Sequence, residues 1–224
     1  MDLTQAASIG ALADANRRAL YEYVVSEPKP VGREQAATAV DLPLHTASFH
    51  LDRLVAEGLL EVEFRRLTGR TGPGAGRPSK LYRRADRAFA VSLPPRRYDL
   101  VGDILAEAVS RAAGGESLDR SLAASAREEG QALGAAVTGM SHEPTLPAVA
   151  EVLAGQGYQP RLDDNVVTLR NCPFDDLARK HTQLVCGLNR TFVQGVLDGL
   201  ERADATACLE PEAGSCCVKV RPTD

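Results

Sequence analysis

Apolar residues recur at helical spacing along the first quarter of the chain. Over residues 4–25 they fall three or four positions apart, which predicts one long helix or two helices joined near Gly10. A short helix over residues 33–40 follows, then a turn at 41–43 and a second helix over about 44–57. Two helices joined by a short turn have the outline of a helix-turn-helix.

The pattern changes after Gly58, where alternation replaces helical spacing. Residues 59–67 (LLEVEFRRL) alternate apolar and polar side chains, as a half-buried strand does. A loop rich in glycine and proline follows at 69–79, and residues 80–84 (KLYRR) can return as a second strand. A hairpin directly after a helix-turn-helix predicts a winged helix, which is a more specific signal than either part alone.

Both patterns occur in the remainder of the chain, which we therefore assign to the α+β class. Helices are predicted at Tyr98–Ala113, at Leu118–Ala136, from Pro147 to Leu153, and between Phe174 and about Leu200. Short strands are predicted at Tyr158–Leu162, Val166–Leu169, Ala205–Leu209 and Cys216–Val220.

Charge is distributed unevenly along the chain. Residues 1–84 hold 12 basic and 10 acidic residues, a net charge of +2, whereas residues 85–224 carry −6. The segment Phe64–Arg84 has seven basic residues and no acidic one, which suits a polyanionic partner. No apolar run reaches the roughly 20 residues that span a bilayer, and no secretory signal opens the sequence. We expect a cytoplasmic protein without membrane association.

One face of the helix over residues 44–57 is suited to reading DNA. Ala47, Leu51 and Leu54 fall on the inward side, which leaves polar, aromatic and cationic side chains outward near the helix N-terminus, where a recognition helix meets base edges. The basic hairpin would contribute phosphate contacts and therefore affinity. The residues assigned to DNA are His45, Thr46, Ser48, Phe49, His50 and Arg53 on the helix, with Arg65, Arg66, Arg70, Arg77 and Lys80 in the wing.

All five cysteines lie within the last 53 residues, an odd number with no export signal, which indicates metal, cluster or redox chemistry. Their spacing contains no close CxxC pair. Thiolates converging from separate elements would suit either Zn²⁺ or a [4Fe–4S] cluster and would exclude magnesium and calcium. The candidate ligands are Cys172, Cys186, Cys208 and Cys216.

The neighbour of Cys216 and the one histidine of this region are given other roles. If Cys216 and Cys217 lie on one strand they point to opposite sides, so we expect only Cys216 to face the site. Cys217 is then a buried small hydrophobe or a second redox thiol. His181, five residues before Cys186, is expected to be a surface residue or the start of a helix.

Two parts of the sequence resemble known families. REQAATAVDLPLHTASFHLDRLVAEGLLEV followed by GRPSKLYR is similar to winged-helix bacterial repressors of the ArsR/DeoR kind. NCPF…H…VCGLN…GVLDGL…CLEPEAGSCCVKV resembles the cysteine-bearing domain of SufR-type regulators, which bind an iron–sulfur cluster and repress cluster-assembly genes. It also resembles the 4-vinyl-reductase-type small-ligand domain, whose closing C-x7-C pattern matches Cys208 to Cys216. The resemblance implies a homodimer and cluster ligands at Cys172, Cys186 and Cys208 or Cys216.

We therefore predict three regions: a winged-helix DNA-binding domain at 1–93, a linker and dimerisation helix at 94–115, and an α+β sensor domain at 116–224. The leading hypothesis is a regulator, expected to be a repressor, that binds double-stranded operator DNA as a homodimer and senses an iron–sulfur cluster, [4Fe–4S] being favoured. Alternatives are a zinc-stabilised regulator with a small organic effector and a metal-free thiol redox switch. Nothing in the motifs favours an enzyme.

Overall fold

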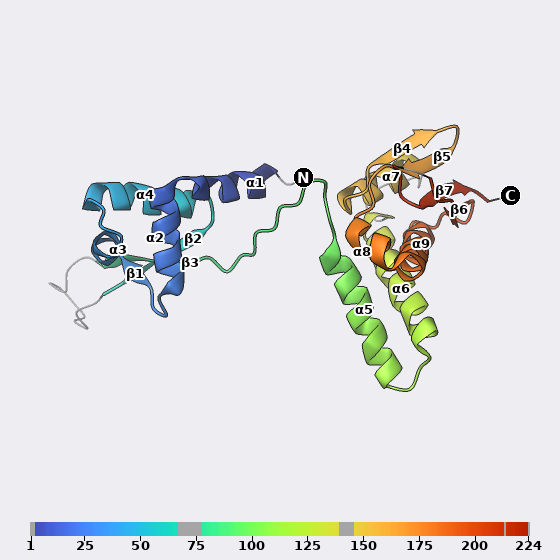
Figure 1. Ribbon diagram of the computed structural model, residues 1–224, viewed down its shortest axis with the longest axis horizontal. Coiled ribbons are helices and arrows are strands. Elements are labelled where there is room, and N and C mark those ends of the chain that lie inside the picture. Colours follow the sequence, from blue (N-terminus) through green and yellow to red (C-terminus); the bar gives the residue numbers. More distant parts are fainter. Residues whose placement is uncertain (1–2, 67–77, 139–145, 213, 224) are drawn as a thin grey trace. The chain divides into compact units, whose positions relative to one another are not determined.

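A computed structural model describes residues 3–66, 78–138, 146–212 and 214–223. The chain divides into two compact units, one up to Val91 and one from Ser92 onward, and each has its own hydrophobic core (Figure 1). The observed mixture of helices and strands confirms the α+β class.

Unit 1 is a helical domain with a small antiparallel sheet. Its strands pair in the order β1-β3-β2, and Val62 lies opposite Tyr82 in the β2–β3 hairpin. The elements are α1 (Leu3–Gly10), a 3-10 turn (Ala11–Ala13), α2 (Ala15–Ser26), β1 (Val31–Gly32), α3 (Arg33–Ala39), α4 (Leu44–Ala56), β2 (Leu60–Arg65) and β3 (Ser79–Arg84).

Local chemistry explains where these helices begin and end. The carboxylate of Asp14 accepts a hydrogen bond from the Arg17 amide at 2.9 Å and so caps α2, and of the two predicted alternatives the structure has two helices, α1 ending at Gly10. Gly58 has a φ of +72°, a left-handed conformation that stops the chain from continuing α4 and turns it into β2. Both helices of the helix-turn-helix and both strands of the wing lie where the sequence predicted them.

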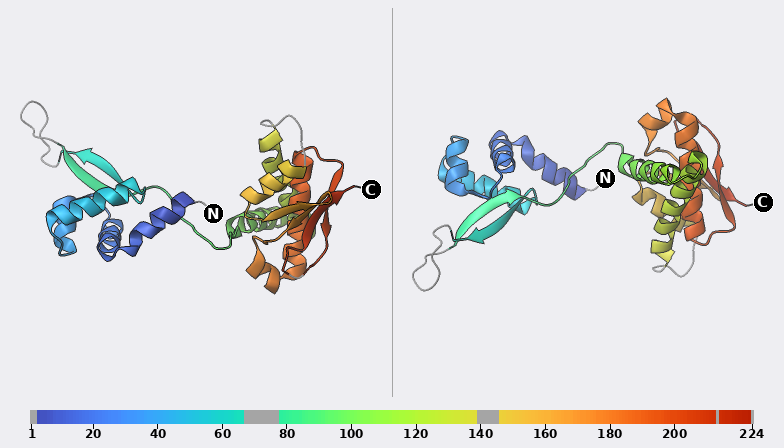
Figure 2. Two further views of the ribbon diagram at one scale, coloured as in Figure 1. Left: turned by 90° about the horizontal axis from the view of Figure 1, so that it is seen from above. Right: turned by 90° about the horizontal axis from the view of Figure 1, so that it is seen from below.

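Unit 2 combines five helices with a four-stranded antiparallel sheet of order β4-β5-β7-β6 among the residues described. The elements are α5 (Tyr98–Ala113), α6 (Leu118–Thr138), α7 (Leu146–Gly155), β4 (Pro160–Asp163), β5 (Val166–Leu169), α8 (Asp175–Lys180), α9 (Thr182–Gly199), β6 (Ala205–Leu209) and β7 (Val218–Pro222). The sheet forms one layer beside α9, as Figure 2 shows from above and below.

The helix α9 is the centre of unit 2. It packs against β6 and β7 on one side and against α6 on the other, and α5 packs on α6. The backbones of α6 and α9 approach closely because glycines face each other: an added Cβ at Gly130 or Gly195 would collide with backbone atoms of the opposite helix. The helix assigned to a linker, α5, is therefore part of this unit, and its role in dimerisation stays a prediction.

One detail differs from the sequence prediction: the last strand begins at Val218, so Cys216 and Cys217 precede it. His181 lies between α8 and α9. No helix in the described ranges is long and apolar enough to cross a membrane.

Candidate functional sites

The outer face of α4 presents the side chains expected of a recognition helix. Phe49 is 66% exposed, and His45 and Arg53 are also exposed, while Ala47 and Leu51 are fully buried against unit 1. Arg53 forms an ion pair with Glu57 at 2.6 Å, one turn further along the helix. An exposed face with hydrogen-bonding, aromatic and cationic side chains on the second helix of a helix-turn-helix is what a recognition helix presents to base edges.

His50 is a correction to the predicted DNA-contact set. Its side chain is only 9% exposed, because it lies three residues after Ala47 and four before Leu54, on the inward face of α4. Its Nδ1 is buried with no hydrogen-bond partner among the described residues.

Ser48 is half-buried, and its hydroxyl donates back to the Leu44 carbonyl at 2.7 Å. Thr46, three residues before Phe49 on α4, is half-buried, and its Oγ1 lies 3.2 Å from His45 Nε2.

The wing is attached to α4 through Asp52. Its carboxylate pairs with Lys80 Nζ at 2.5 Å and accepts a hydrogen bond from the buried Tyr82 hydroxyl at 2.8 Å. Burial opposes ionisation of Asp52, but the hydrogen bonds from Lys80 and Tyr82 outweigh it and hold the pKa of this carboxyl below its ordinary value. The strand β3 is thereby held against the helix, and the Lys80 charge is partly offset.

The other wing cations differ in their surroundings. Arg65 forms an ion pair with Glu63 at 3.4 Å, and Arg66 is exposed just beyond the end of β2. Arg70 and Arg77 lie outside the described residues. Arg83 pairs with Glu61 at 2.9 Å. A part of the positive charge of the hairpin is therefore compensated within the hairpin itself.

A second site is formed by four cysteines of unit 2, which we call the cysteine site: Cys172, Cys186, Cys216 and Cys217. Cys172 lies in the loop between β5 and α8, Cys186 lies in the second turn of α9, and the other two immediately precede β7. The Cys216 amide donates to the Leu169 carbonyl at the end of β5 (2.7 Å), which brings the start of β7 next to the Cys172 loop.

The four thiols lie close enough to influence one another's pKa values. The Cys216 thiol is within hydrogen-bonding range of Cys172 and Cys217, and Cys217 is also in range of Cys186. The hydrogen bond from Cys216 outweighs burial and lowers the pKa of Cys217 to about 6. A hydrogen bond from Cys216 likewise lowers the pKa of Cys172. Burial, with the bond to Cys217, raises the pKa of Cys186 to about 12. Cys217 thus favours the thiolate that soft metals bind, and the pKa of Cys172 is shifted in the same direction.

Cys208 does not belong to this site, which corrects the predicted ligand set. Along β6 the side chains of Ala205 and Ala207 point into the core, so Cys208 points to the other face of the sheet. There it lies opposite Lys219 of β7 and close to Arg221. The alternation visible in the sequence ATACL already contains this information.

Cys217 is the fourth member of the cysteine site, a role that the sequence prediction assigned to Cys208. The prediction assumed that Cys216 and Cys217 lie on a strand and point apart. Because β7 begins at Val218, the two cysteines lie in the preceding turn, where strand alternation does not apply, and both thiols face the site. Cys216 is 1% exposed and Cys217 is half-buried. His181 is exposed at the start of α9, as predicted.

Two polar residues that the sequence prediction missed support the cysteine site. The amide of Asn189, one turn after Cys186, donates to Cys216 Sγ at 3.1 Å and accepts from the Tyr158 hydroxyl at 2.5 Å. Burial raises the pKa of Tyr158 well above its ordinary value, so the hydroxyl is a stable donor. Both are buried, so the pair fixes the Cys216 sulfur in position.

The donor set of the cysteine site fits a soft metal or a cluster. Four sulfur atoms converge from three separate segments, and two of them have lowered pKa values. In the described part of the chain no group of three or more Cys, His, Asp or Glu side chains is arranged as a metal site as it stands. Binding would therefore require the four thiols to move toward a common centre.

Comparison with known proteins identifies the first unit. Residues 12–63 match the family of the helix-turn-helix domain, which covers α2, α3, α4 and most of β2. Neither the search of curated proteins nor the search of solved structures gives a significant match. The match and the exposed face of α4 agree on the same helix. The chain therefore carries a helix-turn-helix domain of the kind found in DNA-binding transcription regulators.

Proposed function

We propose that this regulator senses an iron–sulfur cluster, with [4Fe–4S] favoured, bound at the cysteine site, and that occupancy of the site changes its affinity for operator DNA. The observation that carries the proposal is the convergence of Cys172, Cys186, Cys216 and Cys217 from three segments far apart in sequence. Core packing can bury free cysteines as small hydrophobes, but it does not require four of them to meet at one place.

The chemistry of the donors supports a thiophilic occupant. Sulfur ligands suit zinc and iron–sulfur clusters and do not suit magnesium or calcium. When bound, a cluster would supply a centre sensitive to oxidants. Cys186 and Cys216 are buried and Cys172 and Cys217 are half-buried, and Asn189, which also binds Tyr158, positions Cys216. The alternative occupant, zinc, uses the same four ligands and is distinguished by metal analysis.

The residues of the chain can convert occupancy into a structural change. An occupant bound to all four thiols would tie the β5–α8 loop, α9 and the entry to β7 together. Without such an occupant, hydrogen bonds join these segments. We further propose that the regulator, acting as a repressor, is a homodimer, because two recognition helices are needed to read half-sites about 34 Å apart. On α5, Val109 is 59% exposed and is available for such a contact.

Paired cysteine substitutions test the proposal. Cys217→Ser should abolish binding, since serine oxygen is a poor ligand for soft metals. Cys208→Ser is the matched control, because its thiol lies on the other face of the sheet, and it should keep the wild-type content. The measurement is iron, sulfide and zinc per chain after anaerobic purification, with a visible spectrum.

The outcomes of this experiment separate the alternatives. Iron and sulfide that are lost only in Cys217→Ser agree with the cluster. Zinc without sulfide, lost in the same variant, would replace the cluster with a zinc site. If Cys217→Ser and Cys208→Ser retain equal metal, the assignment of the ligands is contradicted.

A metal-free thiol switch is a second candidate function, favoured by the contacts between the thiols. Two neighbouring thiols such as Cys186 and Cys217 can form a disulfide, losing two electrons and two protons to an oxidant such as a peroxide. A DNA-binding response to peroxide that dithiothreitol reverses, in protein free of iron and zinc, would support this function over the cluster.

A further inference from the structure

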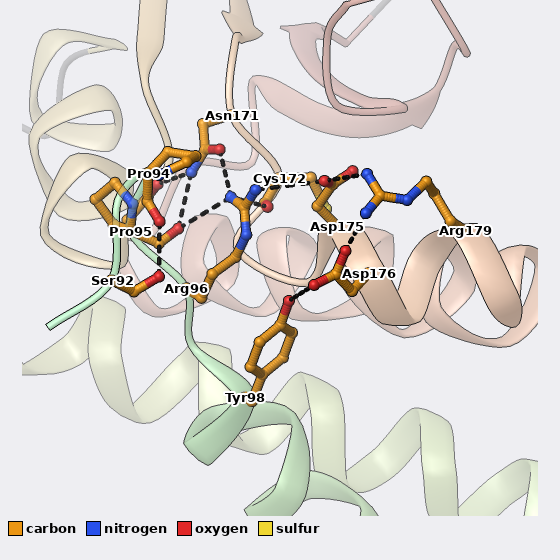
Figure 3. Close-up of polar contacts among 11 residues, drawn as sticks. Ser92, Pro94, Pro95, Arg96, Tyr98, Asn171, Cys172, Asp175, Asp176 and Arg179 are labelled. Atoms are coloured by element: carbon orange, nitrogen blue, oxygen red, sulfur yellow. Dashed lines mark hydrogen bonds and ion pairs between the residues drawn. The ribbon is translucent and has the colours of Figure 1, made fainter. Parts of the chain in front are cut away.

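The first residues of unit 2 are bound directly to the loop that carries Cys172. Figure 3 shows Arg96 reaching this loop from the linker segment, which we define as residues 92–97. Its Nη1 donates to the Cys172 carbonyl at 3.2 Å and to Asn171 Oδ1 at 2.7 Å, and its Nη2 pairs with Asp175 Oδ2 at 3.3 Å.

The two sequence neighbours of Cys172 complete the attachment. Asn171 is buried, and its Nδ2 donates to the Pro95 carbonyl at 3.0 Å and to the Gly157 carbonyl at 2.6 Å. The Pro173 carbonyl accepts a hydrogen bond from the Arg97 amide at 3.1 Å. The residues on either side of Cys172 are therefore each bonded to the backbone of the linker segment.

The position of Arg96 is determined by these contacts. Its side chain is only 17% exposed, and a guanidinium removed from water is costly unless its donors are satisfied. The acceptors are the Cys172 and Pro95 carbonyls, Asn171 and Asp175. A shift of the Cys172 backbone would weaken several of these bonds together, because all the loop acceptors lie within residues 171–175.

We propose that Arg96 is a positioning residue that couples the state of the cysteine site to the order of the linker segment. The inference rests on the proposed function, because it needs a change at the Cys172 thiol. Cys172 carries both the thiol and the carbonyl that Arg96 binds, so a backbone shift that brings the thiol to an occupant also moves the carbonyl that holds the linker segment. That segment continues at Val91 into unit 1.

Hydrogen–deuterium exchange of the full-length protein tests the coupling. The reporter is the peptide covering residues 92–98, which contains the Arg97 amide bonded to Pro173. Exchange is compared with Zn²⁺ bound and after chelation. In the wild type we expect the exchange rates of this peptide in the two states to differ roughly ten-fold. Such a factor corresponds to the free energy of about one hydrogen bond to a charged group. Bound Zn²⁺ is quantified in the same samples.

The same change from arginine to lysine at two positions separates coupling from general destabilisation. Arg96→Lys keeps the charge but loses the multiple hydrogen bonds, so the difference should fall to less than about two-fold while Zn²⁺ is retained. Arg179→Lys is the matched control: Arg179 shares Asp175 with Arg96 but is exposed and does not touch Cys172, so it should respond like wild type.

Each possible result decides for or against the role of Arg96 or the coupling itself. An undiminished response in Arg96→Lys, or equal loss in both variants, overturns the role of Arg96. Wild-type protein that binds Zn²⁺ with no change in the linker segment overturns the coupling, even if Arg96→Lys does not fold. Wild-type protein that binds no Zn²⁺ counts against zinc as the occupant and does not bear on the coupling. The coupling is then judged by alkylating the thiols with N-ethylmaleimide, and it fails if exchange stays the same.

Discussion

At the scale of single residues, Phe49 is a large apolar side chain that the fold leaves exposed on the predicted recognition face. It is 66% exposed on α4 and contacts the ring of His50 edge-on, with centroids 5.3 Å apart. An apolar ring at this position can pack on thymine methyl groups in the major groove. Phe49 and His50 are adjacent, but one faces outward and the other faces the core.

This difference predicts opposite effects of truncation. Phe49→Ala should weaken DNA binding by about 1–3 kcal/mol and change the free energy of unfolding by less than about 0.5 kcal/mol. His50→Ala should instead destabilise unit 1, because it empties a buried position. Binding is measured by fluorescence anisotropy on DNA selected from a random pool by the wild-type protein, and stability by urea unfolding. Unchanged binding by Phe49→Ala would remove it from the recognition surface.

The cysteines show how far residue roles can be predicted from sequence. Cys172, Cys186 and Cys216 were predicted as ligands and are brought together, because each follows from the expected order of strands and helices. The exchange of Cys208 for Cys217 depends on where β7 begins, a shift of two residues from Cys216 to Val218. Strand ends are set by tertiary hydrogen bonds such as that from Cys216 to Leu169, which no local pattern reveals.

At the scale of elements, most helices and strands follow from periodicity alone. The bounds of α5 and β6 agree with the prediction residue for residue. The close approach of α6 and α9 was not predicted, although both contain glycines four residues apart. Such spacing shows that two helices can approach, but not which helices do so. Here Gly130 and Gly195 allow backbone contact that any side chain would prevent.

A single methyl group should therefore separate these helices. In Gly130→Ala the new Cβ would collide with the Phe192 carbonyl and lie 2.8 Å from the Val196 amide nitrogen, both backbone atoms that cannot turn aside. We expect a loss of about 1–3 kcal/mol from the stability of unit 2. Urea unfolding followed by circular dichroism measures it.

The control for this substitution is Gly102→Ala in α5. Nothing lies within 4 Å of the Cβ added at Gly102, so the same change should stabilise the helix by about 0.5–1 kcal/mol. Equal effects at Gly102 and Gly130 would mean that the α6–α9 contact is not as close as described.

At the scale of the whole molecule, the sequence predicts two functions in one chain but not how they communicate. The basic segment Phe64–Arg84 and the cysteines after residue 171 indicated separate binding tasks, and the two units have separate cores. The contacts of Pro95 and Arg96, both in the linker segment, with Asn171 join residues 75 and 76 positions apart in sequence. Local patterns cannot predict contacts of that separation, which only the folded chain reveals.

The central claim is that the cysteine site controls DNA binding, and one comparison tests it most directly. The DNA affinity of a single anaerobic preparation is measured before and after removal of its metal, with Cys217→Ser and Cys208→Ser alongside. We expect Kd to change about ten-fold or more, within the usual range of coupling between two sites, in the wild type and in Cys208→Ser. Cys217→Ser should show no change. Equal affinities of the loaded and stripped wild-type protein would contradict the claim.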